Sequence, residues 1–295
     1  MTAAAIPAPA LPIAAVPLLF VGIWATGFIV ARLVAPHVDP LTFLSFRFVL
    51  SALLFSGIAL VAGAAWPRSR TGWRDALVAG VLMQGIYLGG VFWSVRHGLP
   101  AGLSALVTGL QPLLTAALAW PVLGERVSGR RWAGIAAGFA GAVMVLWPQL
   151  QLGPVLQVPL ALSGVAMVGM TLGTIWQKRT ASQADLRTNA AIQFIGAAAV
   201  TIPVAALTEA GRFDMGWQAW TGLAWAVLGL SFGAISLLLL LIKRGAVAGV
   251  ASLFYLVPPV VAVMAFVLFQ EQLVPIQMAG MAVAAAGVAL ASRNP

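Results

Sequence analysis

The sequence predicts an all-α integral membrane protein of ten transmembrane helices, arranged as two inverted five-helix repeats. Three observations lead to this fold class. Of the 295 residues, 61% are hydrophobic and only 8% are charged, with a mean hydropathy of +1.00, whereas about 25% of the residues of a soluble domain are charged. The apolar residues fall into runs of about 20, the length that crosses a bilayer. The second half of the chain also repeats the first at a constant offset.

The apolar runs define ten spans in chain order, with no segment between them long enough for a soluble domain. We expect helices at about 12–35, 41–63, 75–97, 100–124, 131–147, 158–178, 188–208, 217–242, 246–270 and 275–291. The residues before the first span, MTAAAIPAPALP, contain no Lys or Arg. They therefore lack the basic region of a secretory signal peptide, and we expect a short tail.

Basic residues predict the orientation, because cytoplasmic loops carry an excess of Lys and Arg. One set of alternate loops, with the C-terminus, holds Arg68, Arg70, Arg74, Arg126, Arg130, Arg131, Lys178, Arg179, Arg187, Lys243, Arg244 and Arg293, and the other holds Arg32, Arg96 and Arg212. This bias predicts that both termini are cytoplasmic. The net charge of +9 is thinly spread among these loops, which indicates topology signals and no nucleic-acid partner.

An internal duplication appears when the chain is shifted by 146 residues, the distance from Gly27 to Gly173. The same shift pairs Ile29 with Ile175, Asp39 with Asp185, Leu77 with Leu223, Ala105 with Ala251, Pro112 with Pro258, Glu125 with Glu271, Gly134 with Gly280 and Gly141 with Gly287. Each half has five spans, and because five is odd, the second half must enter the membrane inverted relative to the first. Inverted repeats are typical of secondary transporters.

Two stretches carry a resemblance to a known family: GLQPLLTAALAWPVLGERVSGRRWAGIAAGFAGAVMVL and its repeat partner YLVPPVVAVMAFVLFQEQLVPIQMAGMAVAAAGVAL. They resemble the EamA-type branch of the drug/metabolite transporter superfamily, and within it most of all the YddG-type exporters of aromatic and other neutral amino acids. The resemblance implies EamA-type repeats at 12–147 and 158–293, with spans 5 and 10 packed together. It also implies a bacterial inner-membrane exporter of small metabolites that works by alternating access as a monomer among lipids.

Prolines interrupt the middle of two repeat-equivalent spans. Pro112 lies in span 4, and Pro258 and Pro259 lie in span 9. A proline in a helix interior frees the carbonyl four residues earlier, and broken helices at matching positions indicate a transport site. The alternative is an ordinary kink, which membrane helices tolerate when neighbours satisfy the backbone. We favour a gating or cavity-lining role because the positions are symmetric.

Polar and aromatic residues at mid-depth supply the candidate binding site. The candidate substrate-binding residues are Trp24, Arg47, Gln84, Tyr87, Thr108, Gln111, Thr171 and Tyr255. For the small hydroxyls, hydrogen bonding between helices is an equally good explanation. The larger groups of Gln84, Gln111 and Tyr255 are costlier to bury without partners, which favours a cavity. Trp24 lies at mid-depth in span 1, whereas the tryptophans near span ends are typical of the interface.

Arg47 is the one basic residue left inside a span. It lies about six residues from the outer end of span 2, or roughly 9 Å deep at 1.5 Å per residue, where an unpaired charge is costly. One interpretation is a structural tie near the outer surface to Asp39, Glu271 or free carbonyls. The other is contact with a substrate carboxylate. The repeat-equivalent residue, Gln193, is neutral, so folding of a five-helix unit does not require the charge.

The sequence shows no obvious energy source. All seven acidic residues lie at or near span ends, whereas proton-coupled carriers usually keep a carboxylate within the membrane. Smaller four-helix relatives carry a glutamate in their first helix, where this chain reads GIWATGF. No nucleotide-binding G-x-x-x-x-G-K-[ST] motif occurs, and without cysteine the chain has no thiolate metal site. We therefore predict a facilitator or exchanger without a cofactor.

Other functional classes fit the sequence less well. A passive channel is disfavoured because no filter loop or charged ring is present, while a lipid flippase of the same fold is harder to exclude. The segment GLSFG, with Ser231 at its centre, matches the hydrolase pattern G-x-S-x-G, but that motif needs a strand-to-helix turn with a histidine base. Ser231 instead lies within span 8, far from His37 and His97, and we expect no enzymatic activity.

Overall fold

The computed structural model describes residues 15–111, 113–115, 118, 128–150, 157–180, 185–234, 237, 257–271 and 274–292. These residues are almost entirely helical, with one isolated bridge between Val38 and Phe213. The helices are α1 (Ala15–Val34), α2 (Pro40–Val61), α3 (Arg70–Gly80), α4 (Tyr87–Arg96), α5 (Ala101–Thr108), α7 (Gly129–Leu150), α8 (Gln157–Thr180), α9 (Leu186–Thr208), α10 (Trp217–Trp225), α13 (Val257–Phe269) and α14 (Pro275–Ser292), with π-helical segments η1 (Val81–Ile86) and η3 (Ala226–Ala234).

The helices agree with the predicted spans. Five are long and apolar enough to cross a membrane: Val16–Val34, Pro40–Val61, Arg70–Arg96, Gln157–Thr180 and Leu186–Thr208. Within the other predicted spans, the described helices are α5, α7, α10 with η3, α13 and α14. Most of the second half of span 4, the end of span 8 and the beginning of span 9 fall outside the described residues. The prediction of an all-α membrane protein is confirmed.

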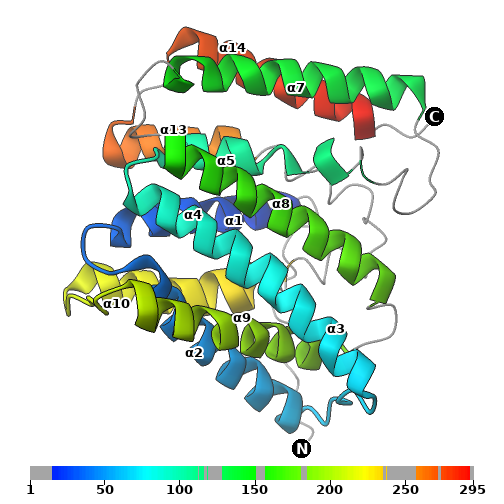
Figure 1. The fold of residues 1–295 in the computed structure, drawn as a ribbon, viewed down its shortest axis with the longest axis vertical. Coiled ribbons are helices and arrows are strands. Elements are labelled where there is room, and N and C mark those ends of the chain that lie inside the picture. Colours follow the sequence, from blue (N-terminus) through cyan, green and yellow to red (C-terminus); the bar gives the residue numbers. More distant parts are fainter. Residues whose placement is uncertain are drawn as a thin grey trace, which may run out of the picture.

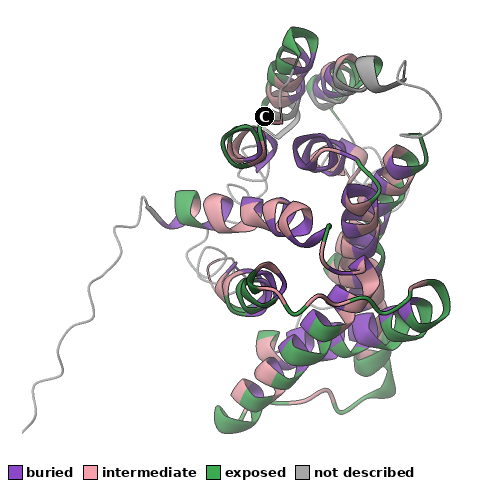
Figure 2. Cartoon of the chain, turned by 90° about the vertical axis from the view of Figure 1, so that its left-hand side faces the viewer, coloured by how far each residue is buried: buried purple, intermediate pink, exposed green. Residues whose placement is uncertain are grey.

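The outward faces of the helices are exposed (Figure 2), and many of the exposed residues are large and apolar. Leu60 and Leu207 are 70% and 85% exposed, and Phe139 and Val263 are also mostly exposed. An exposed apolar surface of this extent would be a liability in water. In a membrane protein it is the surface that contacts lipid tails.

Two helix pairs lie toward opposite ends of the molecule's long axis. The pair α7 and α14, from spans 5 and 10, forms one end, and α2 with α9, from spans 2 and 7, lies toward the other (Figure 1). The helices α1, α4, α5, α8 and α13 lie between these pairs. The expectation from the resemblance that spans 5 and 10 pack together agrees with this arrangement.

The contacts between helices are exchanged between the two halves. Helix α8 packs against η1, and the repeat-equivalent contact joins α1 to η3. Likewise α1 packs against α13, and its equivalent joins α8 to α5. The pairs α2 with α9 and α7 with α14 are equivalent to themselves under the same exchange. A pseudo-two-fold axis produces this pattern, because each contact between a helix of the first repeat and a helix of the second has a counterpart in which the two repeats are exchanged.

Glycines bring the paired helices into close contact. A Cβ atom added to Gly141 would collide with the backbone of α14 at Ala284, and one added to Gly287 would collide with α7 at Gly138. Between α3 and α9, a Cβ atom on Gly196 would lie 2.6 Å from the Leu77 carbonyl oxygen. Small residues allow this approach where no hydrophobic effect drives helices together.

The loops at the predicted outer surface tie span 2 to span 7. The Glu209 carboxylate accepts hydrogen bonds from the backbone N–H groups of Leu41 and Thr42, both at 2.8 Å, and so satisfies the free donors at the start of α2. The Asp39 carboxylate accepts one from the Arg212 backbone N–H at 2.8 Å. These contacts and the Val38–Phe213 bridge fix the outer ends of the two helices.

The predicted cytoplasmic ends are joined more loosely. The Thr188 hydroxyl near the start of α9 donates to the Ala65 carbonyl, which follows α2, at 3.1 Å. Asp185 caps α9 by accepting from the Arg187 N–H at 2.9 Å. The hydrogen bond from the Arg187 side chain lowers the pKa of the Asp185 carboxyl below its usual value. The cap is therefore strongest when Asp185 is ionised, and it weakens as pH falls through this lowered pKa.

Two π-helical segments occur at repeat-equivalent positions. Adding 146 to η1, residues 81–86, gives 227–232, which lies within η3 at 226–234. The Ser231 hydroxyl donates to the Ala226 carbonyl, five residues earlier, at 3.0 Å. Such segments are rare and frequently occur at functional sites. The sequence predicted matched helix breaks at the prolines of spans 4 and 9. The matched π-helical segments in spans 3 and 8 were not predicted.

Replacement of Ser51 by alanine is expected to stabilise the protein. Ser51 in α2 is fully buried, and its hydroxyl is the one buried side-chain oxygen in the described part of the chain without a hydrogen-bond partner. Since an unpaired buried hydroxyl costs roughly 1–3 kcal/mol, the midpoint of thermal unfolding in detergent should rise.

The matched control is Ser94→Ala. Ser94 is equally buried, but its hydroxyl donates to the Pro159 carbonyl at 2.7 Å and joins α4 to α8. Its removal should lower stability by about 1 kcal/mol. If both variants lowered the unfolding midpoint equally, the explanation by the missing partner would be wrong.

Candidate functional site

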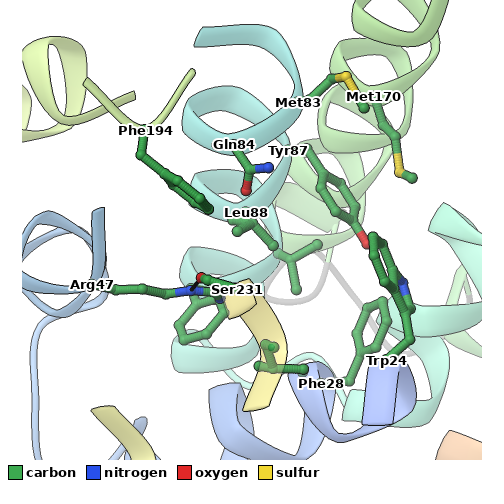
Figure 3. Close-up of a pocket in the computed structure, with 14 residues that line it drawn as sticks. Trp24, Phe28, Arg47, Met83, Gln84, Tyr87, Leu88, Met170, Phe194 and Ser231 are labelled. Carbon is green, nitrogen blue, oxygen red and sulfur yellow. Dashed lines mark hydrogen bonds between the residues drawn. The ribbon is translucent and has the colours of Figure 1, made fainter. Parts of the chain in front are cut away.

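A pocket lies among helices from both halves of the chain (Figure 3). Its volume is about 80 Å³. The lining residues are Trp24, Gly27 and Phe28 from α1, Arg47 from α2, Met83 and Gln84 from η1, Tyr87, Leu88, Val91 and Phe92 from α4, Met170 from α8, Phe194 from α9, and Leu230 and Ser231 from η3. Both π-helical segments therefore contribute to one pocket.

Arg47 reaches into this pocket from α2 toward Ser231 (Figure 3). It is only 5% exposed, and its Nε donates to the Ser231 hydroxyl oxygen at 3.4 Å. No carboxylate of the described residues pairs with it. A guanidinium has five N–H donors in a planar fork suited to a carboxylate, so most of its binding capacity is unused.

The two carboxylates that the sequence suggested as partners of Arg47 form hydrogen bonds with other groups. Asp39 accepts from the Arg212 backbone N–H. Glu271 accepts from the Arg32 Nε at 3.2 Å and lies 3.4 Å from the backbone nitrogen of Ala101, at the start of α5. The hypothesis of a tie to Asp39 or Glu271 is therefore corrected: Arg47 lies in a pocket wall, and its described polar contact is with Ser231.

Three neutral polar residues share the pocket with Arg47. Gln84 belongs to η1, and its side-chain amide has no hydrogen bond to any described residue. Tyr87 begins α4, and the Thr108 hydroxyl lies beside its side chain. Ser231 donates to Ala226 and accepts from Arg47. Gln84 and Tyr87 thus offer one amide and one phenol group to a ligand.

The remaining wall is aromatic and apolar. Trp24 and Tyr87 point into the pocket from the side opposite Arg47 in Figure 3, and Phe194 forms another part of the wall. Met83 and Met170 close a further part of the wall. Methionine is flexible and fills irregular spaces, so this part of the wall can adapt to the shape of a ligand.

The other predicted binding residues in the described part of the chain do not line this pocket. The Gln111 amide donates to the Thr115 hydroxyl at 2.9 Å and to Thr174 at 3.4 Å. The Thr108 hydroxyl donates to the Ser104 carbonyl at 2.9 Å, and the Thr171 hydroxyl to the Met167 carbonyl at 2.9 Å. Their roles in binding stay predictions, and Tyr255 lies outside the described residues.

The predicted helix breaks are described only in part. Pro112 lies outside the described residues. Pro258 and Pro259 lie in helix α13, and the residues that precede Val257 fall outside the described part of the chain. A Cβ atom added to Gly109 would lie 2.6 Å from the Pro258 ring, so spans 4 and 9 are in close contact at this point. Gating by these prolines stays a prediction.

The pocket is too small in this conformation for an amino acid. Its volume of about 80 Å³ is well below the 300–1,000 Å³ that pockets for small molecules usually hold. The structure thus describes a contracted state of the site, and a ligand larger than a few atoms requires movement of the wall.

Ser231 has no catalytic surroundings in the described part of the chain. His97 stacks on Trp93, with ring centroids 3.6 Å apart, and His37 lies 3.9 Å from Asp214, in the loop that follows α1. Neither histidine lines the pocket. No group of three metal-ligating side chains occurs among the described residues either. The G-x-S-x-G match therefore corresponds to a π-helical turn.

Sequence reasoning missed several lining residues. Phe28, Met83, Met170, Phe194 and Leu230 are apolar residues in apolar spans, so no local pattern separates them from lipid-facing neighbours. Ser231 attracted attention only as a nucleophile. The repeat offered a signal for span 8, because Leu230 is the repeat equivalent of the predicted binding residue Gln84.

Comparison with known proteins places both halves of the chain in one family. The sequence model of the family described as "EamA-like transporter family" matches residues 12–147 and 158–293. A "Probable amino-acid metabolite efflux pump" of Escherichia coli K12 is 28% identical over 165 residues, 56% of this chain and 53% of that protein. The "Uncharacterized transporter YvbV" of Bacillus subtilis is 24% identical over 88% of this chain and 84% of its own.

The efflux-pump match spans about half the length of that relative. A solved crystal structure has a TM-score of 0.67 over 94% of this chain and 96% of its own, at 18% identity. At that identity the likeness shows the fold alone.

Proposed function

Because the chain belongs to the EamA-like transporter family, we propose that it exports small amphipathic metabolites bearing a carboxylate, such as aromatic and other neutral amino acids, by alternating access across a bacterial inner membrane. The proposal carries over the efflux activity named for the Escherichia coli relative. In this proposal both termini are cytoplasmic, the protein works as a monomer, and the pocket around Arg47 is the substrate site.

The observation that carries the proposal is the buried Arg47 with an open guanidinium. A charged side chain within the membrane is costly and marks a functional site unless it is paired. Here the charge faces a pocket in which Trp24, Phe28 and Phe194 offer apolar surface for the body of a substrate. A carboxylate on an aromatic or aliphatic body complements both features.

The pseudo-two-fold arrangement supports alternating access. If the two repeats exchanged conformations, the contacts of α8 with η1 and of α1 with η3 would exchange with them. The site would then open toward the opposite side of the membrane without new types of contact. Rocking or gating of one repeat against the other around a central site is the usual mechanism for inverted-repeat transporters.

The test is counterflow in proteoliposomes. The purified protein is reconstituted with an unlabelled candidate inside, and uptake of the same labelled compound is followed, with protein-free liposomes as the leak control. Saturable, transient accumulation is expected for at least one aromatic amino acid or related carboxylate. No exchange of any water-soluble carboxylate would contradict the proposal, and uptake without saturation would indicate a pore.

Transport is further expected to be independent of an imposed proton gradient. No acidic residue lines the pocket, and all seven in the sequence lie at or near span ends, so no carboxylate is positioned to carry a proton through the membrane. A pH gradient is imposed while the pH on the side of the labelled substrate is kept constant. The initial rate of counterflow should then change by less than about two-fold. A steep increase would show coupling.

A further inference from the structure

The charge of the pocket is positive and uncompensated. Arg47 is the one ionised side chain among the lining residues. The segments of spans 4, 8 and 9 outside the described residues add no acid at mid-depth, because between Asp75 and Asp185 the sequence holds only Glu125, at the end of span 4, and between Asp214 and Glu271 it holds none.

The described acids all have partners away from the pocket. Asp75 pairs with Arg74, Asp185 with Arg187, Asp214 with Arg212 and Glu271 with Arg32, while Glu209 and Asp39 accept from backbone N–H groups of the outer loops. None of them can turn into the pocket without breaking these contacts and crossing several helical turns. The ligand itself is then the available source of a compensating negative charge.

A zwitterionic ligand and an anionic ligand differ in the net charge that they leave in the occupied pocket. A carboxylate anion bound to Arg47 makes the site neutral. An amino acid brings the same carboxylate together with an ammonium group, so the occupied site keeps a net charge of +1 away from water, where charges interact strongly. A buried charge is tolerated when it is paired, and the pocket offers the ammonium only neutral acceptors such as Gln84 and Ser231.

On the premise of the proposed function, we infer that the pocket selects organic monocarboxylate anions with an aromatic or apolar body over zwitterionic amino acids of the same shape. The Gln84 amide and the Tyr87 hydroxyl can donate to an oxygen at the position next to the carboxylate, which an ammonium cannot accept. The preferred cargo is therefore a 2-hydroxy or 2-oxo acid.

The experiment compares two ligands that differ in one group. L-3-phenyllactate carries a hydroxyl where L-phenylalanine carries the ammonium, and the two are otherwise alike in shape. Binding to the purified full-length protein in detergent is measured by titration calorimetry at pH 7.5, which avoids leakage of the hydroxy acid through liposomes. Phenyllactate is expected to bind at least about ten-fold more tightly, equivalent to 1.4 kcal/mol.

Two variants relate this preference to the charge. In Arg47→Gln the pocket is neutral, and the preference for phenyllactate should fall to within about two-fold, which corresponds to less than 0.5 kcal/mol. Arg74→Gln removes an exposed arginine at the far end of α3, paired with Asp75, and should keep the wild-type preference. Phenylalanine amide, which carries only the positive charge, should not bind the wild-type protein.

The outcomes separate this inference from the proposed function. If phenylalanine binds as tightly as phenyllactate and exchanges in counterflow, the selectivity for anions is overturned while the proposed function stands. If neither compound binds and no carboxylate exchanges, both fail. Equal preference for phenyllactate in wild type and in Arg47→Gln would also overturn the inference, because the selectivity would not depend on the charge.

Discussion

Replacement of Arg47 by glutamine is expected to reduce the apparent affinity for carboxylate substrates at least about 100-fold, roughly 2.7 kcal/mol. The guanidinium is the one cation in the pocket wall, and losing one partner of a buried charge pair typically costs 2–5 kcal/mol. Concentration-dependent counterflow measures the effect. Lysine at this position keeps the charge but not the planar fork of donors, so Arg47→Lys should lie between the two.

The control must show that the variant still folds, because Arg47 also contacts Ser231 at 3.4 Å. Size-exclusion profiles and unfolding midpoints in detergent should match those of the wild type for Arg47→Gln, and Arg74→Gln should transport normally. If Arg47→Gln fails to fold, the purely structural interpretation gains support. If it folds and transports carboxylates with unchanged affinity, the assignment of Arg47 to the substrate is wrong.

Replacement of Gly80 by alanine is expected to destabilise the protein by about 2–3 kcal/mol, the upper part of the range for overpacking. A Cβ atom at this position would collide with the backbone carbonyl of Gln193 in α9. A backbone atom cannot move aside as a flexible side chain can, so α3 and α9 must separate. The midpoint of thermal unfolding and the yield of monodisperse protein measure the loss.

Gly57→Ala is the matched control for Gly80→Ala. Gly57 lies in α2 on an exposed face, and no atom lies within 4 Å of the position that its Cβ would take. Since alanine favours a helix by roughly 0.5–1 kcal/mol over glycine, this variant should be neutral or slightly more stable. Equal destabilisation of both variants would indicate that the α3–α9 contact has no special role.

Much of the fold follows from the sequence because a membrane limits the choices. Backbone polar groups must be satisfied within each span, so apolar runs of about 20 residues had to be helices, and their order followed from the duplication. The α7–α14 contact was expected only through the family resemblance. The matching contacts of α8 with η1 and of α1 with η3 agree with the predicted inversion.

Only part of the candidate site could be predicted from the sequence. Trp24, Arg47, Gln84 and Tyr87 were selected because each is polar or amphipathic within a predicted span, and all four line the pocket. Thr108 and Thr171 satisfy their hydroxyls on their own helices, a local use that sequence spacing does not reveal. The partner of Arg47 could not be chosen from sequence either, because Asp39 and Glu271 are held by contacts that depend on how the outer loops fold.

The matched segments η1 and η3 also have a mechanical consequence. A π turn contains one more residue than the α turn it replaces, and one residue of an α-helix corresponds to a rotation of about 100°. If η1 tightened to α geometry, the face carrying Gln84 would turn relative to the face of α3 that holds Gly80 against α9. Each repeat thus has one extra residue in a π turn beside the pocket. Conversion of this turn to α geometry would rotate the pocket-facing side of the helix without requiring its two ends to move.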